Sequence, residues 1–269
     1  SLYRDYIHKG KMDYLYDKVE LYDTLKHILQ GHGSTDNLVP ILEGLKDIEH
    51  HMLHFLENHD EQRIASPEFA GNPWKAMPAM VVSATVSTSP TMIYFGQEVG
   101  EPGAEDAGFG DPSRTSIFDY IGVPHHQKWM NGGKFDGGQL TENEKALRNY
   151  YSEVLNFTRN SSALMGEYLE LHSFNRSQNP AYTNKTFAFA RWDESQKLIV
   201  VTNFDEFKSV KTTLKLSPEL LKAWNLEPGE REIKELMFGK KKTMLRVTDA
   251  GAEIELDFGP WESAVFEVK

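Results

Sequence analysis

From residue 11 to residue 160, short apolar runs alternate with stretches in which apolar side chains recur at helical spacing. The apolar runs, each of strand length, lie at residues 11–16, 52–56 and 90–95. Helical spacing is found at residues 17–31, 38–48, 74–86 and 141–159. A continuous apolar run is typical of a strand covered on both faces, and strands that alternate with helices in this order predict a parallel α/β sheet.

The pattern changes from about Met165 onward. Apolar runs separated by short polar turns lie at residues 186–192, 197–203, 210–216, 233–238, 254–258 and 264–268, with one helix expected at residues 218–224. Consecutive strands joined by short turns predict an antiparallel sheet or sandwich. We therefore expect two domains, an α/β domain at residues 1–163 and an all-β domain at residues 164–269.

The composition indicates a folded chain that is suited to a neutral ligand. Its 269 residues are 39% hydrophobic and 12% aromatic, which is enough for a packed core in one large domain or two ordinary ones. The net charge of -11 argues against nucleic acid, whose affinity comes mainly from cationic contacts with phosphate. Every apolar run falls short of the roughly 20 residues that a membrane helix needs, so no membrane span is expected.

The sequence leaves the compartment open. Cys is 0, so neither a disulfide framework nor a Cys-based zinc site is expected, and secreted, periplasmic and cytoplasmic locations all stay open. Residue 1 is Ser and nothing like a signal peptide follows it. We therefore expect a trimmed or processed piece of a longer protein.

The candidate site is the end of the apolar run at residues 52–56, where Glu57, Asn58, His59 and Asp60 follow directly. In barrel enzymes, the carboxyl ends of the strands carry the chemistry, and residues there point into one shared pocket. An amide, an imidazole and a carboxylate in a row could hold several hydroxyls of a sugar ring. The alternative is a polar turn in which Asn or Asp caps a helix.

This segment resembles the fourth signature region of the α-amylase superfamily, glycoside hydrolase family 13, in which Asn-His-Asp ends the seventh barrel strand. The resemblance implies that Asp60 is the third family carboxylate, which holds ring hydroxyls and stabilises the transition state. It also implies that His59 contacts the same sugar ring. Asn58 and Arg63 are further candidates for substrate binding. Arg63 is expected to orient Asp60 through a salt bridge, the alternative being a solvent-exposed arginine.

The resemblance covers nearly the whole chain. Residues 11–17 and the helix after them resemble the sixth barrel strand and its helix, and residues 90–98 resemble the eighth strand with its Tyr-Phe-Gly-x-Glu pattern. Matches in the all-β part are Arg191, residues 201–204 and residues 260–264. The implied fold is a partial TIM barrel, comprising strands six to eight with their helices, followed by an antiparallel β-sandwich domain.

The implied function is that of the C-terminal part of an α-amylase-like glycoside hydrolase that acts on an α-glucan or maltooligosaccharide. A retaining glycosidase needs a nucleophile and an acid/base, two carboxyl groups about 5 Å apart. In the family these are an Asp after the fourth strand and a Glu after the fifth, and neither segment is recognisable here. We therefore expect this chain alone to be inactive. The alternative is a non-catalytic carbohydrate-binding or scaffold protein that has kept the fold. The choice between hydrolase and glucan transferase stays open.

Further residues could add chemistry to the site. Asp60 and Glu98 could form a carboxylate pair, unless Glu98 only holds its loop by hydrogen bonds. Histidines could bind zinc, although a strand would have to break for them to converge; they are His50, His51, His54 and His59. Acidic residues of the long loop at residues 99–139 could bind calcium, although their spacing matches no EF-hand; they are Glu101, Glu105, Asp106 and Asp111.

The long loop also carries aromatic residues that could stack on sugar rings or simply pack the loop onto the barrel. They are Phe118, Tyr120 and Trp129. A three-strand piece of an eight-strand barrel would leave two unpaired sheet edges. We therefore expect either self-association through these edges or pairing with the missing part of the barrel.

Overall fold

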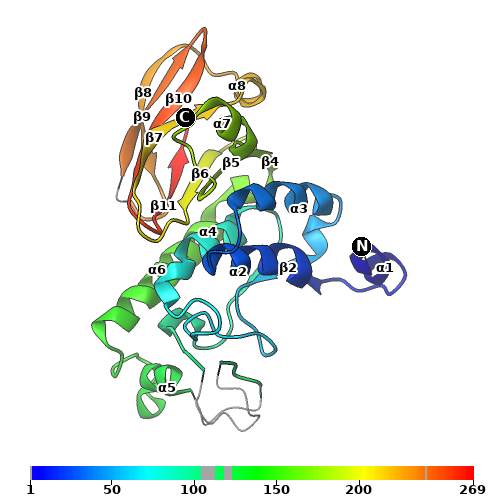
Figure 1. Cartoon of the computed structure of the whole chain (residues 1–269), viewed down its shortest axis with the longest axis vertical. Helices are drawn as coiled ribbons and strands as arrows, with labels where there is room; N and C mark the ends of the chain where they lie inside the picture. Colours follow the sequence, from blue (N-terminus) through cyan, green and yellow to red (C-terminus); the bar gives the residue numbers. More distant parts are fainter. Residues whose placement is uncertain (1, 104–112, 118–122, 240) are drawn as a thin grey trace.

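The computed structural model describes residues 2–103, 113–117, 123–239 and 241–269. In these segments the strands form a parallel sheet of three strands and an antiparallel sheet of eight. Figure 1 shows the antiparallel sheet, from the green β4 to the red β11, stacked along the longest axis on the helices of the blue-to-green part of the chain. Both kinds of sheet were predicted from the hydrophobic pattern.

The parallel sheet has β2 (Met52–Phe55) between β1 (Leu15–Tyr16) and β3 (Thr91–Met92). Leu15 lies opposite Met52, and His54 lies opposite Thr91. β1 and β3 are shorter than the apolar runs that predicted them, because each pairs with β2 alone and its run continues into loops. The arrangement is a partial fold with a three-stranded parallel sheet, as expected, and its assignment to strands six to eight of a TIM barrel stays a prediction.

Helices lie between the strands of both sheets and at the start of the chain. They are α1 (Leu2–His8), η1 (Lys18–Tyr22, a π-helix), α2 (Asp23–Leu29), η2 (Thr35–Asn37), α3 (Leu38–Leu45), η3 (Glu49–His51), η4 (Pro73–Ala76), α4 (Met77–Thr85), η5 (Gln97–Val99), α5 (Pro124–Met130), η6 (Asn131–Gly133), α6 (Glu142–Asn160), η7 (Ser162–Met165), α7 (His172–Gln178) and α8 (Pro218–Trp224). Nearly every residue of α4 is buried. A helix that is apolar all round must be covered on all sides, and α4 contacts β2 of one sheet and β6 and β11 of the other.

The antiparallel sheet is one continuous sheet, not a sandwich of two separate ones. Its strands are β4 (Glu167–Glu170), β5 (Thr186–Trp192), β6 (Lys197–Asn203), β7 (Val210–Leu216), β8 (Gly229–Glu235), β9 (Lys242–Thr248), β10 (Gly251–Phe258) and β11 (Ser263–Glu267). They are hydrogen-bonded in the order β4-β5-β6-β11-β8-β9-β10-β7. The sheet curls so that residues from β5 to β11 share one core. The predicted sandwich was therefore right in its antiparallel strands and wrong in its number of sheets.

The central strands of this sheet are buried on both faces. Phe187 and Phe189 of β5 pack in the cluster that contains α4 and α6, whereas Ala188 and Ala190 pack in the core inside the curled sheet. The cluster around α4 and α6 therefore extends across the expected domain boundary at residues 163 and 164. That boundary stays a prediction.

Arg191, near the end of β5, ties the antiparallel sheet to α4 and η7. Its guanidinium is fully buried and donates to the backbone oxygens of Leu164 at 2.6 Å and Thr85, the last residue of α4, at 3.4 Å. Burial lowers the pKa of Arg191 to about 10, so the side chain keeps its charge at neutral pH. A charged donor in a dry interface fixes the position of the backbone groups that it contacts.

Candidate active site

The loop that follows β2 carries the predicted site residues to the carboxyl edge of the parallel sheet. Because the strands run parallel, the same edge receives Asp17 after β1 and residues 93–98 after β3. Burial falls along the loop: Glu57 is buried, His59 is half-buried and Asp60 is exposed. His59 and Asp60 thus reach solvent at the carboxyl edge of the parallel sheet.

Asn58 shapes the turn that presents Asp60. Its side-chain oxygen accepts hydrogen bonds from the backbone N–H of Asp60 at 2.8 Å and of Glu61 at 2.9 Å. The Asn58 side chain is itself buried. It forms the local polar turn that was the alternative reading of this segment. Asn58 therefore acts as a positioning residue, and its amide nitrogen is the group that stays available for a ligand.

His59 and Asp60 form the outer end of the loop. His59 Nε2 lies 3.3 Å from Asp60 Oδ2, and the two side chains are 38% and 70% exposed. Arg114 Nη1 donates to the backbone oxygen of Asp60 at 3.4 Å, so this contact leaves the carboxylate itself to solvent. A carboxylate that accepts hydrogen bonds, beside an imidazole that can donate one, suits a ligand with neighbouring hydroxyl groups.

Arg63 does not form the expected salt bridge with Asp60, nor is it a solvent-exposed arginine. Its side chain is fully buried, and Nη1 donates to Glu57 Oε2 at 2.7 Å. Nε donates to Thr115 Oγ1 at 3.1 Å, and the guanidinium lies over the rings of Tyr94 and Phe95 at 4.7 and 5.0 Å. Arg63 pairs with the buried Glu57 and not with the exposed Asp60, because a buried carboxylate loses its hydration and is stabilised by a neighbouring cation. The pair fixes the inner part of the loop.

Glu57 is the buried carboxylate of this pair, and sequence reasoning did not assign it a role. Its Oε1 accepts from the backbone N–H of Ile64 at 2.7 Å, which closes the loop onto itself. Burial raises the pKa of Glu57, while the neighbouring Arg63 opposes that rise. The signal that could have found it is an acid placed directly after a buried strand, because such a group needs a cation within reach.

Glu101 is a second buried carboxyl, which the sequence analysis considered only as a candidate calcium ligand. Its Oε2 accepts from the backbone N–H of His125 at 2.9 Å and of His126 at 3.1 Å, while Oε1 has no partner within the described part of the chain. Burial raises the pKa of Glu101 to about 7. This carboxyl therefore fastens the start of α5 to the loop after β3.

Glu98 lies half-buried in η5, in the segment that follows β3. Its charge raises the pKa values of the buried Glu57 and Tyr151, which places it near those two groups. The hypothesis that Glu98 and Asp60 form a carboxylate pair stays a prediction.

The predicted metal ligands are spread over different surroundings. His54 is buried, with Nδ1 at 2.8 Å from the backbone oxygen of Ser83, and burial lowers its pKa to about 4. The His50 and His51 rings lie 4.1 Å apart and directly precede β2, whereas His59 follows it, so they lie at opposite ends of the strand. In the segments that the structure describes, no group of three or more His, Cys, Asp or Glu could hold a metal ion. Of the predicted calcium ligands, Glu105, Asp106 and Asp111 lie outside the described residues.

The predicted stacking residues are described only in part. Phe118 and Tyr120 lie outside the described residues. Trp129 stacks on His126 at 5.8 Å and contacts Phe135 at the same distance, with Arg148 over its ring at 5.4 Å. These contacts belong to the packing of α5.

A parallel α/β part followed by a curled antiparallel sheet is similar in fold to the carboxyl-terminal half of solved amylases. The α-amylase of Anoxybacillus matches 98% of this chain and 49% of its own, with 17% identity and a TM-score of 0.65. The maltogenic α-amylase AmyB from Thermotoga neapolitana matches 98% and 53%, with 18% identity and a TM-score of 0.62. AmyP in complex with maltose matches 95% and 50%, with 17% identity and a TM-score of 0.63.

The chain thus spans about half the length of the solved structures that it matches. At identities this low the similarity shows the fold alone. No protein-family model matches the sequence. Among the helices of the described segments, none is both long and apolar enough to cross a bilayer.

Proposed function

We propose that this chain is the C-terminal part of an α-amylase-like glycoside hydrolase, with an α-glucan or maltooligosaccharide as its substrate and a retaining mechanism. The observation that carries the proposal is the exposed Asp60 beside His59 at the carboxyl edge of the parallel sheet. The fold that the chain shares with AmyP, which is known in complex with maltose, supports the choice of sugar.

In this proposal, Asp60 stabilises the transition state. Its carboxylate accepts hydrogen bonds from two ring hydroxyls, and these bonds strengthen as the ring flattens and gains positive charge. Such binding accelerates the reaction because it is stronger in the transition state than in the ground state. His59 donates to a hydroxyl of the same ring. Asn58 fixes the turn, and the Glu57–Arg63 pair keeps the loop in position when a substrate binds.

The nucleophile and the acid/base are proposed to come from sequence outside this chain, so the chain alone does not hydrolyse glucans. Purified chain incubated with maltooligosaccharides should release no more product than an Asp60→Ala control. Turnover above that control would refute this part of the proposal. Sequence upstream that carries the expected Asp and Glu would favour the hydrolase, whereas its absence would favour a non-catalytic carbohydrate-binding or scaffold protein.

Binding tests the role of Asp60 directly. In a titration of the ¹⁵N-labelled chain with maltoheptaose, backbone amide shifts are expected at residues 58–61, and Asp60→Asn should abolish them. Asp13→Asn is the matched control, because Asp13 is exposed and precedes β1, at the amino edge of the parallel sheet and away from the carboxyl edge that carries Asp60. Shifts at residues 58–61 that survive Asp60→Asn would contradict the proposed site.

A further inference from the structure

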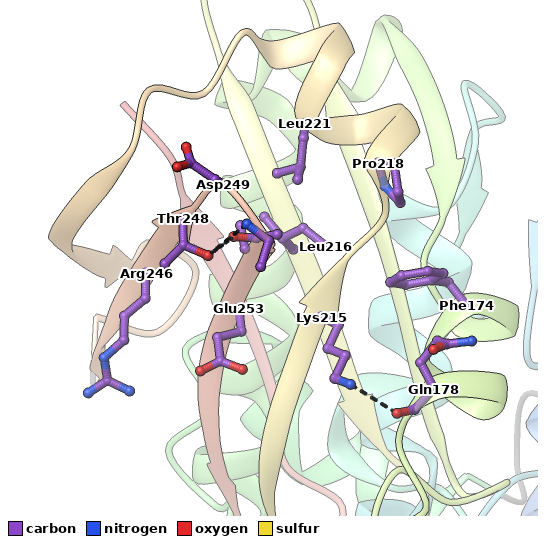
Figure 2. A pocket seen from close by; sticks show the side chains of 13 residues that line it. Phe174, Gln178, Lys215, Leu216, Pro218, Leu221, Arg246, Thr248, Asp249 and Glu253 are labelled. Carbon is purple, nitrogen blue, oxygen red and sulfur yellow. Dashed lines mark hydrogen bonds between the residues drawn. The ribbon is translucent and has the colours of Figure 1, made fainter.

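We propose that the antiparallel sheet carries a second binding site, for a neutral oligosaccharide, between α7, α8 and the turn that joins β9 to β10. A cavity of about 550 Å³ lies there, within the size range of small-molecule sites. Figure 2 shows side chains from three separate parts of the chain around it: α7, the connection from β7 into α8, and the β9–β10 hairpin. None of its lining residues belongs to the loop of Asp60.

One wall of the cavity is apolar and includes an aromatic ring. Phe174 of α7 is half-buried and lies beside Pro218, with Leu216 and Leu221 completing the wall. An aromatic side chain offers a flat apolar face at a low entropic cost. The C–H face of a pyranose ring is the complementary surface in a sugar.

The polar part of the lining carries charges that cancel. Lys215 and Arg246 line the same cavity as Asp249 and Glu253. The strand register places Glu253 of β10 between Lys215 of β7 and Arg246 of β9. Since the lining contains equal numbers of cations and carboxylates, it favours an uncharged polar ligand over an anion or a cation.

Glu253 is the group in this row that is left for a ligand. Lys215 Nζ donates to the backbone oxygen of Gln178 at 3.0 Å, and Arg246 donates to two glutamates at 3.1 and 2.5 Å. The Glu253 carboxylate makes no hydrogen bond or ion pair within the described residues, although it stands between two cations. A carboxylate in this position accepts hydrogen bonds readily, and hydroxyl groups supply them.

An aromatic face, a carboxylate acceptor and a neutral lining together match a ligand that is apolar on one side and rich in hydroxyls at its edge. An oligosaccharide has these properties. That the oligosaccharide is an α-glucan rests on the proposed function. A polymeric α-glucan could bind at both sites of one molecule, and so bind more tightly than at either site alone.

The test uses residue-resolved binding of maltoheptaose to the whole ¹⁵N-labelled chain. Amide shifts are expected at residues 248–251 and at Lys215, separately from those at residues 58–61. Phe174→Ala should weaken binding at this second site by about fivefold, since stacking on an aromatic side chain contributes roughly 1 kcal/mol. Phe207→Ala, which removes a ring that is 83% exposed and outside the cavity, should change nothing.

Glu253→Gln is a second variant that tests the site without touching the apolar wall, and it should weaken binding as well. Asp60→Asn should leave the shifts at residues 248–251 in place, so the two sites succeed or fail independently. The proposal is overturned if maltoheptaose causes no shift at residues 248–251, or if those shifts persist unchanged in both Phe174→Ala and Glu253→Gln.

Discussion

The residues that fix the candidate site are not the ones that would meet a substrate. The exposed His59 and Asp60 stand on a turn held by Asn58, and that turn rests on the buried pair of Glu57 and Arg63. An ion pair in a dry core adds little net stability, but breaking it leaves an uncompensated charge. The positions of His59 and Asp60 therefore depend on the buried charges of Glu57 and Arg63.

Arg63→Met should destabilise the chain by about 3–5 kcal/mol, because it leaves the Glu57 carboxylate buried without a cation. The free energy of unfolding in urea at neutral pH measures this loss. The double variant Glu57→Leu/Arg63→Met serves as the control and should recover most of the stability, since neither charge remains. A loss below about 1 kcal/mol in the single variant would mean that the pair behaves like an exposed one.

Glu101 should give the chain a pH-dependent stability. Its folded pKa of about 7 exceeds the ordinary value of 4.5, so the folded state keeps the proton that the unfolded chain releases. The stabilisation is present below pH 4.5 and is lost as pH rises to about 7, by on the order of 3 kcal/mol in total.

The comparison with Glu101→Gln isolates this effect, because glutamine stays neutral and can still accept from the backbone of α5. Unfolding free energies of both proteins, measured from pH 4.5 to 8, should move in favour of the variant as pH rises. Asp17, whose pKa is raised to about 6 by burial, titrates in the same window in both proteins and cancels in the difference. A difference that stays constant with pH would exclude the raised pKa.

At the residue scale, the sequence predicted the exposed part of the site better than the buried part. The Asn-His-Asp motif is contiguous, so its position after a strand was enough to place Asp60 at the edge of the sheet. The partner of Arg63 was predicted wrongly because distance along the chain favoured Asp60, whereas desolvation selected Glu57. The contact of Glu101 with α5 was not predicted, because its partners are backbone groups at residues 125 and 126, more than twenty positions away.

At the scale of elements, local signals predicted α2, α3, α4, α6 and α8, whereas α1, α5 and α7 were not predicted. Thr141 and Glu144 form the capping box that the sequence indicated: Thr141 Oγ1 accepts from the backbone N–H of Glu144 at 3.3 Å, and Glu144 Oε2 accepts from that of Thr141 at 2.6 Å. Glu144 also accepts from Lys128, which ties α5 to the start of α6.

Thr141→Ala should lower the free energy of unfolding by about 1 kcal/mol, because it leaves a backbone N–H at the start of α6 without its acceptor. Thr141→Ser keeps the hydroxyl and should stay within a few tenths of a kcal/mol of the parent chain. Denaturation of both variants in urea measures the effect. Equal losses in Ala and Ser would show that the methyl group of Thr141, and not its hydroxyl, matters.

The strands were harder to predict because a strand is completed by partners distant in the sequence. β1 and β3 were predicted too long, since apolar side chains mark burial and not the hydrogen bonds of a ladder. In the second sheet, β5, β6 and β7 were placed to the residue, β8 and β10 only in part, and β4 and β9 were not predicted. The strand order was not predicted either, because β11 inserts between β6 and β8 only in the folded chain.

At the scale of the whole molecule, the parallel sheet ends in strands that are paired on one side among the described residues. Tyr14 and Tyr16 are 59% and 38% exposed along the β1 edge. An open edge beside exposed aromatic residues invites pairing with another chain.

The chain should therefore associate as its concentration rises, with the sedimentation coefficient as the measure. Tyr14→Lys/Tyr16→Lys should shift it toward the monomer, because charges on an edge strand disfavour pairing. A chain that stays monomeric at every concentration, with β1 amides as protected from hydrogen exchange as those of β2, would refute this.

The hydrophobic cluster that joins α4 and α6 to Phe187 and Phe189 limits how the two parts of the chain can evolve. A segment whose outer face is completed by its neighbour cannot be exchanged between related genes as an independent module. A recombinant joining this β part to a foreign barrel would have to bring along matching helices, so the two parts are expected to diverge in concert.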